Sequence, residues 1–195
     1  MQARETATPY QTSKKHYTYM DYLQLPDDGM RYEIIEGELF MSPAPTPLHQ
    51  RIIRKLLVKL DNFVEKSHCG EVFDAPIDVV FNEENIVQPD IVFIARENIS
   101  NITEKNIQGA PGLIIEILTP GTAYNDLVNK KDLYAKFDVK EYWIVDPQKQ
   151  WIEMYTLTEK EYTLHQRAVK SGKVSSVVLN GFQVLLKDTF SYPSQ

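Results

Sequence analysis

The chain has 195 residues, of which 43% are hydrophobic and 25% are charged. This composition fits one globular domain with a sizeable core, and eleven tyrosines and eight phenylalanines argue against disorder away from the ends. The formal net charge of −6 excludes a protein that coats nucleic acid non-specifically, so an anionic partner would need a local basic patch or a metal ion.

Cysteine usage and hydropathy indicate the compartment. Cys69 is the single cysteine, so no intrachain disulfide can form and a reducing interior is expected. The N-terminal residues are too polar for a signal peptide, and no apolar run approaches the ~18 residues of a spanning helix. We therefore expect a cytoplasmic protein without a membrane segment.

The first third of the chain predicts a tail, a hairpin and a long helix. Residues 1–16 are expected to form a flexible tail, and residues 17–195 a single domain. Thr18 can cap a short helix over 17–25, and two apolar segments around Glu36-Gly37 predict a tight β-hairpin. Apolar residues at helical spacing predict a long helix over 48–66.

The remaining chain alternates between strand-like and helical patterns. Segments bounded by turn residues predict strands over 71–73, 77–81, 91–94, 112–118, 141–146, 151–157, 162–168, 177–179 and 182–185. Residues 125–137 have helical period. These elements predict an α/β or α+β domain with a mixed central sheet, a long helix on one face, a second helix near the site, and C-terminal β-hairpins.

Three charged positions could carry chemistry. Asp90 directly precedes an apolar strand, Glu116 lies in the middle of another, and Lys130 follows in the next helix. If the strands are neighbours, the two carboxylates repel each other, and a hard divalent cation such as Mg²⁺ or Mn²⁺ removes that penalty. The same residues also fit a turn aspartate, a satisfied salt bridge and a solvated helix face.

Four stretches carry a resemblance to a known family. They are YEIIEGELFMSPAPTPLHQ (32–50), QPDIVFIA (88–95), PGLIIEILTPGTAYNDLVNKKDLYAKFDVKEYWIVDP (111–147) and LNGFQVLLKDTF (179–190). In this order they resemble the Uma-two-type family of "putative restriction endonucleases", within the PD-(D/E)XK nuclease superfamily. The resemblance implies a restriction-endonuclease-like core with flanking helices.

The resemblance also implies roles for individual residues. Pro89-Asp90 takes the place of the superfamily's PD, and Glu116 takes the place of its second acid. The superfamily's usual lysine position is Leu118 here, which cannot act as a cation. A family spacing D-x-x-x-K-x-x-x-Y matches Asp126, Lys130 and Tyr134, which share one helical face. Lys130 is therefore the candidate for a lysine that has migrated from the strand to the helix.

Supporting residues are expected from the N-terminal elements. In many superfamily members a glutamate on the first helix helps to hold a second metal, and this helix offers His49 and Gln50 in its first turn. For His49 we expect a positioning hydrogen bond rather than metal ligation, although a role at the helix start remains open. Glu33 alternates with the apolar residues of its strand, so its side chain can face the site.

These residues lead to one main hypothesis and two alternatives. The main hypothesis is a Mg²⁺-dependent endonuclease that cleaves DNA, with Asp90 and Glu116 as metal ligands, Lys130 as catalytic cation and Mn²⁺ as a substitute metal. The resemblance further implies a homodimer. A catalytically silent nuclease-fold module for binding or regulation fits the acidic composition. A hydrolase that uses a carboxylate pair, such as a glycosidase, is the third possibility.

Overall fold

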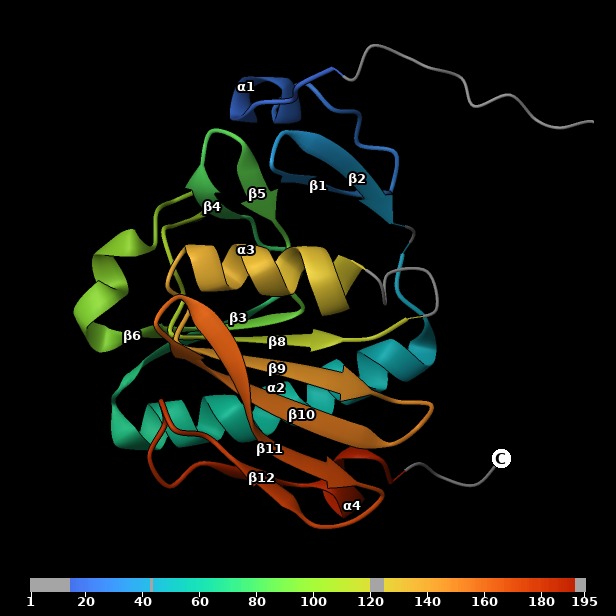
Figure 1. Cartoon of the computed structure of the whole chain (residues 1–195), viewed down its shortest axis with the longest axis vertical. Coiled ribbons are helices and arrows are strands. Elements are labelled where there is room, and N and C mark those ends of the chain that lie inside the picture. Colours follow the sequence, from blue (N-terminus) through green and yellow to red (C-terminus); the bar gives the residue numbers. More distant parts are fainter. Residues whose placement is uncertain (1–14, 43, 120–124, 192–195) are drawn as a thin grey trace, which may run out of the picture.

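The computed structural model describes residues 15–42, 44–119 and 125–191 (Figure 1). Of the predicted tail, residues 1–14 lie outside this part of the chain, whereas Lys15 pairs with Asp21 at 2.8 Å and His16 pairs with Glu84 at 2.8 Å. In the described ranges, no helix has both the length and the apolar character that crossing a membrane requires.

A six-stranded sheet forms the centre of the molecule. Its strands, in spatial order, are β11 (Glu161–Val169), β10 (Trp151–Thr158), β9 (Glu141–Asp146), β8 (Leu113–Ile117), β6 (Ile91–Ala95) and β3 (Gly70–Asp74). The β8–β9 pair is parallel and the other neighbours are antiparallel, so the predicted mixed sheet is confirmed.

The long helix α2 (Pro47–Ser67) covers one face of this sheet (Figure 1). Thr46 caps its N-terminus by accepting the His49 amide hydrogen bond, and Pro47 occupies the first turn, where its missing N–H costs nothing. Ile52, Leu56 and Leu60 of α2 are buried in one hydrophobic cluster with the sheet. This layer is extended by three short elements of the C-terminal region. They are the antiparallel strands β12 (Lys173–Ser175) and β13 (Gln183–Leu185), and the helix α4 (Leu186–Thr189).

A second, five-stranded sheet lies beyond the opposite face. Its order is β2 (Glu38–Ser42), β1 (Arg31–Ile35), β5 (Asn85–Val87), β4 (Val79–Asn82) and β7 (Ile107–Gln108). The predicted hairpin is β1–β2, and Glu36 and Gly37 in its turn both have positive φ, as a type I′ turn requires. This separate sheet, with its strands β5 and β7, was not predicted.

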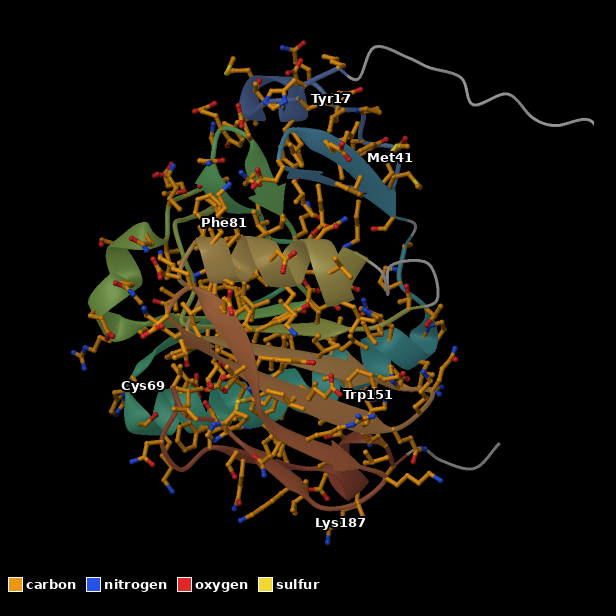
Figure 2. The ribbon with its side chains drawn as sticks, viewed as in Figure 1. Tyr17, Met41, Cys69, Phe81, Trp151 and Lys187 are labelled. Carbon is orange, nitrogen blue, oxygen red and sulfur yellow. The ribbon has the colours of Figure 1, made fainter. Side chains whose placement is uncertain are left out.

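Helix α3 (Lys130–Lys136) packs between the two sheets (Figures 1 and 2). It is preceded by a π-helical turn, η2 (Asn125–Asn129), so the predicted helix over 125–137 exists but begins with a widened turn. Leu133 and Tyr134 join a second hydrophobic cluster that contains residues of both sheets. The short α1 (Tyr19–Tyr22), capped by Thr18, and the 3₁₀ helix η1 (Arg96–Asn101) lie at the periphery.

The predicted strand over 177–179 is wrong. These residues form bends, because the buried Glu141 carboxylate accepts hydrogen bonds from the amides of Val177 and Val178. Amides that are bound to a side chain cannot pair with a neighbouring strand. The hairpin partner of β13 is instead β12, which begins at Lys173.

Candidate functional site

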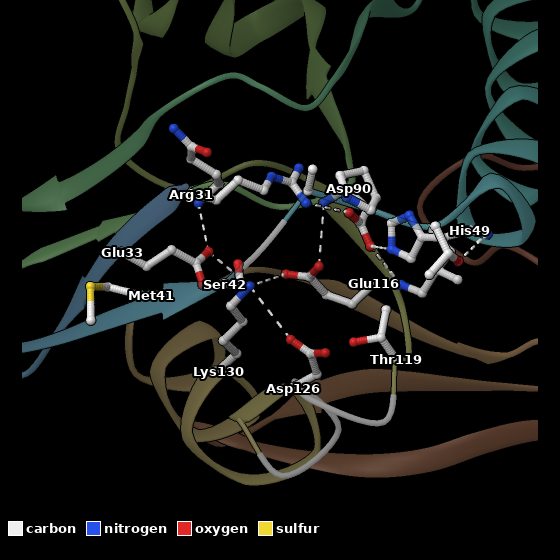
Figure 3. Close-up of a pocket in the computed structure, with 15 residues that line it drawn as sticks. Arg31, Glu33, Met41, Ser42, His49, Asp90, Glu116, Thr119, Asp126 and Lys130 are labelled. Atoms are coloured by element: carbon white, nitrogen blue, oxygen red, sulfur yellow. Dashed lines mark hydrogen bonds and ion pairs between the residues drawn. The ribbon is translucent and has the colours of Figure 1, made fainter. Parts of the chain in front are cut away.

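A cavity of about 260 Å³ opens where the two sheets, α2 and α3 meet (Figure 3). Its lining comes from β1, the end of β2, the first turn of α2, the residues before β6, the end of β8, and the η2–α3 segment. Each of these elements contributes at least one polar side chain. The lining includes Arg31, Glu33, Ser42, Thr46, His49, Gln88, Asp90, Glu116, Asp126 and Lys130.

Strand register brings Asp90 and Glu116 together. Strands β6 and β8 are antiparallel with Ile91 opposite Ile115, which places the residue before β6 beside Glu116. The Asp90 amide donates to Glu116 Oε2 at 3.3 Å, and the Ile117 amide donates to Asp90 Oδ2 at 2.8 Å. Both carboxylates are buried.

Alternation along β8 decides which way Glu116 points. Ile115 and Ile117 pack in the cluster with α2, while Ile114 packs in the cluster with α3. Since successive side chains of a strand point to opposite faces, Glu116 faces α3. The carboxylate thus lies on the side of the sheet from which Lys130 approaches.

Lys130 lies inside a cage of carboxylates. Its Nζ is 2.8 Å from Glu33 Oε1, 3.0 Å from Glu116 Oε1 and 3.5 Å from Asp126 Oδ1. Tyr134, one helical turn later, donates its hydroxyl to Glu116 Oε1 at 2.7 Å. The predicted proximity of Lys130 to Glu116 is therefore confirmed, and Glu33, Asp126 and Tyr134 all reach the same group.

His49 and Arg31 contact Asp90 from the other side. His49 Nε2 is 3.0 Å from Asp90 Oδ2, which matches the expected positioning hydrogen bond. His49 is buried and its Nδ1 has no hydrogen-bond partner in the part of the chain that the structure describes. Gln50, expected beside it, is exposed and does not line the cavity.

Arg31 is a site residue that the sequence reasoning missed. Its Nη1 is 3.3 Å from Asp90 Oδ1, and its side chain is 21% exposed. Arg31 precedes Glu33 by two residues on β1, so the alternation that directed Glu33 to the site also directs Arg31 there. That alternation was the available signal.

The pKa values of Glu116 and Asp90 are shifted in opposite directions. Burial raises the pKa of Glu116 to about 8, because the nearby charge of Lys130 offsets only part of the desolvation, and Asp126, Asp90 and Glu33 add repulsion. Burial also opposes ionisation of Asp90, but His49, the Ile117 amide and Arg31 together lower its pKa below the usual value. Without a metal, Asp90 is thus ionised at neutral pH and Glu116 binds a proton.

The neighbours of Glu116 keep their protons. Burial disfavours the charged form of Lys130, yet Glu116, Glu33 and Asp126 raise its pKa well above the usual value. Burial, followed by the charge of Glu116, raises the pKa of Tyr134 well above its ordinary range. Both groups therefore remain hydrogen-bond donors to Glu116 across the physiological pH range.

The donor set fits a hard cation with an incomplete protein shell. Asp90 and Glu116 offer oxygen atoms, the ligands that Mg²⁺ prefers, and Mg²⁺ usually keeps several waters while binding one or two carboxylates. Within the described ranges, no group of three or more His, Cys, Asp or Glu side chains is placed to hold a metal. When all are ionised, four lining carboxylates against Arg31 and Lys130 leave a formal charge of −2, which one divalent cation would balance.

A comparison with solved structures identifies a protein of the same fold. A crystal structure of a "putative nuclease belonging to DUF820" from Anabaena variabilis ATCC 29413 superimposes with a TM-score of 0.73 at 21% sequence identity, over 89% of this chain and 97% of that chain. This likeness shows a shared fold. No curated protein sequence matches the chain.

The family comparison covers most of the sequence. The model of the Uma2 family matches residues 19–187, a range that includes every element from α1 to β13 and all the residues of the cavity. The resemblance noted in four separate stretches thus extends over one continuous match. The chain belongs to the Uma2 family, whose description is "Putative restriction endonuclease".

Proposed function

We propose that the protein is a metal-dependent endonuclease that hydrolyses phosphodiester bonds of DNA. The observation that supports this most strongly is the set of Asp90, Glu116 and Lys130, with Lys130 Nζ 3.0 Å from Glu116 and the Asp90 amide 3.3 Å from the same carboxylate. An acid pair on adjacent strands with a lysine beside the second acid is the constellation expected of a metal-assisted phosphodiester hydrolase.

Each residue has a distinct task in this proposal. Asp90 and Glu116 would hold Mg²⁺, or Mn²⁺ as a substitute; when bound, the cation supplies Lewis-acid stabilisation and lowers the pKa of water. His49 fixes the orientation of Asp90, as second partners of metal-binding carboxylates do. Tyr134 fixes Glu116 by its hydroxyl hydrogen bond, and Lys130 balances the charge of Glu116 and orients the attacking water.

Plasmid nicking tests the proposal. Supercoiled DNA is incubated with Mg²⁺ or Mn²⁺ and with wild type, Asp90→Asn, Glu116→Gln, Lys130→Met or the control Lys131→Met. Lys131 is the next residue on α3, but its ammonium lies over the Tyr155 ring outside the cavity. We expect the three site variants to lose about a hundredfold or more in rate and Lys131→Met to retain activity. Equal rates in all five proteins would remove these residues from the mechanism.

One observation favours a catalytically silent binding module as a second candidate. Lys130 already pairs with three carboxylates, so the site is internally balanced in part without a metal. A silent module would bind no divalent cation in calorimetry and cut no plasmid under any metal. Metal binding that depends on Asp90 would exclude this candidate.

We further infer that the enzyme works in the cytoplasm as a homodimer. The single cysteine fits a reducing compartment, and superfamily members that cut both strands commonly do so as dimers.

A further inference from the structure

Lys130 and Arg31, the two cations of the cavity, differ in how many of their N–H donors already contact other residues of the protein. Lys130 Nζ lies within 3.5 Å of three carboxylate oxygens, and its side chain is 5% exposed. An ammonium has three donors, and the short contacts to Glu33 and Glu116 use two of them, which leaves one donor, near Asp126, for a water molecule. Lys130 therefore lacks the two free N–H groups that would be needed to hold two phosphate oxygens.

Most N–H donors of Arg31 have no partner among the residues that the structure describes. Its one polar side-chain contact within the described part of the chain is the 3.3 Å pair with Asp90, formed by Nη1 alone. A guanidinium carries five N–H groups in a planar fork, and the side chain remains 21% exposed at the cavity. The register of β1 and β2 places Arg31 opposite Ser42, which also lines the cavity.

Neutralising Asp90 does not by itself account for Arg31. Asp90 Oδ2 already accepts the Ile117 amide at 2.8 Å and lies 3.0 Å from His49 Nε2. An arginine built only to neutralise a carboxylate would be expected to form a short bidentate pair, and this contact is long and single. The guanidinium lies in the cavity beside Asp90 (Figure 3), so its remaining N–H groups are available to a ligand bound there.

We propose that Arg31 is the phosphate-binding residue of the cavity, and that its free N–H groups hold the non-bridging oxygens of the phosphodiester beside Asp90 and Glu116. This inference rests on the proposed nuclease function and assigns substrate binding to a different residue from the one that acts on water. Arg31 contacts the substrate, whereas Lys130 acts on Glu116 and on water. Two parallel N–H groups match two phosphate oxygens, which a lysine at this position could not do.

A binding experiment tests this role without requiring cleavage. Fluorescence anisotropy measures the affinity of a labelled DNA duplex with Ca²⁺ in place of Mg²⁺ over a series of salt concentrations, and a gel of each sample checks that the duplex is intact. The proteins are wild type, Arg31→Ala, Arg31→Lys and the control Arg51→Ala. Arg51 is an exposed arginine of α2 outside the cavity, so its removal deletes the same charge elsewhere.

We expect Arg31→Ala to weaken binding by about tenfold to a hundredfold and to reduce the slope of log affinity against log salt by about one. Arg31→Lys keeps the charge, so it should retain the slope yet bind more weakly than wild type. A merely structural role would lower the thermal midpoint of Arg31→Ala without changing the salt slope. Arg31→Lys, which preserves a cation beside Asp90, provides the comparison if the alanine variant unfolds.

The outcomes separate this inference from the nuclease proposal. If wild type binds DNA but never cuts it with Mg²⁺ or Mn²⁺, the nuclease proposal fails, and the affinities still decide the role of Arg31. If wild type cuts DNA while both Arg31 variants bind and cut like Arg51→Ala, the inference about Arg31 alone is overturned. Absence of any wild-type binding also overturns it.

Discussion

Glu116 is a carboxyl group in the middle of a buried strand, and its environment explains why the fold tolerates it. Tyr134 and Lys130 both donate to Oε1, while the Asp90 amide donates to Oε2. These contacts satisfy the oxygen atoms, but the nearby carboxylates repel additional negative charge. The residue is thus well hydrogen-bonded and still reluctant to ionise, a combination typical of functional carboxyl groups.

The raised pKa of Glu116 predicts a specific pH dependence of stability. Between about pH 4.5 and pH 8 the folded protein holds a proton that the unfolded chain releases. The contribution of Glu116 to the free energy of unfolding should therefore be fully present below this range, fall as the pH rises through it, and level off above it, with a total change on the order of a few kcal/mol. Urea unfolding at a series of pH values, with a chelator present, measures this change.

Glu116→Gln is the matched control, because the amide keeps the shape and cannot titrate. We expect this decline between pH 4.5 and pH 8 to disappear in the variant. Asp90 does not obscure the comparison, since its lowered pKa confines its own loss of stability to more acidic solutions. A decline of equal size in both proteins would show that another group is responsible.

At the scale of elements, Glu141 connects the sheet to the C-terminal segment. It lies at the start of β9, is fully buried, and accepts hydrogen bonds from the Trp143 indole, the Ser176 hydroxyl, and the amides of Val177 and Val178. One carboxylate thus fixes the bend between β12 and β13.

Glu141→Gln should destabilise the protein by about 2 kcal/mol or more, because the amide nitrogen meets N–H donors where an oxygen accepted hydrogen bonds. The exposed Glu161→Gln on β11 is the control and should change stability by less than about 0.5 kcal/mol. Urea unfolding measures both changes, and hydrogen exchange should show faster exchange at Val177 and Val178 in the first variant. Unchanged protection at those amides would contradict the role of Glu141.

Elements whose pattern is local could be predicted from the sequence. Helix α2 is specified by its own apolar spacing and cap, and β8 by its apolar run. The bend over 177–179 could not be predicted, because the carboxylate that forms it is distant in sequence. The π-helical turn η2 likewise shares the periodicity of an ordinary helix at this length, so spacing alone could not reveal it.

The residues of the site also divide into those that sequence patterns indicate and those that depend on contacts between distant segments. Asp90, Glu116 and Lys130 were predicted to lie together because of their strand positions and the family spacing, and their contacts show this proximity. Arg31 was missed because an arginine near a strand start is ordinary on a surface. Alternation along β1 indicates which face Arg31 takes, and the hydrogen bond of the folded chain shows that it reaches Asp90.

At the scale of the whole molecule, the cavity lies where two separate hydrophobic clusters meet. One cluster joins the six-stranded sheet to α2, and the other joins it to α3 and the five-stranded sheet. His49 comes from the first layer, Lys130 and Glu33 from the second, and Asp90 and Glu116 from the sheet between them. A ligand that bridges Asp90 and Glu116 is therefore expected to stabilise the packing of all the layers together.

Metal binding should consequently raise the stability of the entire domain. At a Mg²⁺ concentration a hundredfold above Kd, the stabilisation is about 2.7 kcal/mol, which corresponds to a rise in Tm of about 5 to 10 °C for a domain of this size. Differential scanning calorimetry with Mg²⁺, against KCl of equal ionic strength, measures the shift. Asp90→Asn should abolish it, whereas Glu141→Gln, which removes a buried carboxylate outside the cavity, should lower Tm and retain the Mg²⁺ shift. A shift that survives in Asp90→Asn would place the metal elsewhere, because the neutral amide at that position cannot balance the charge of a divalent cation.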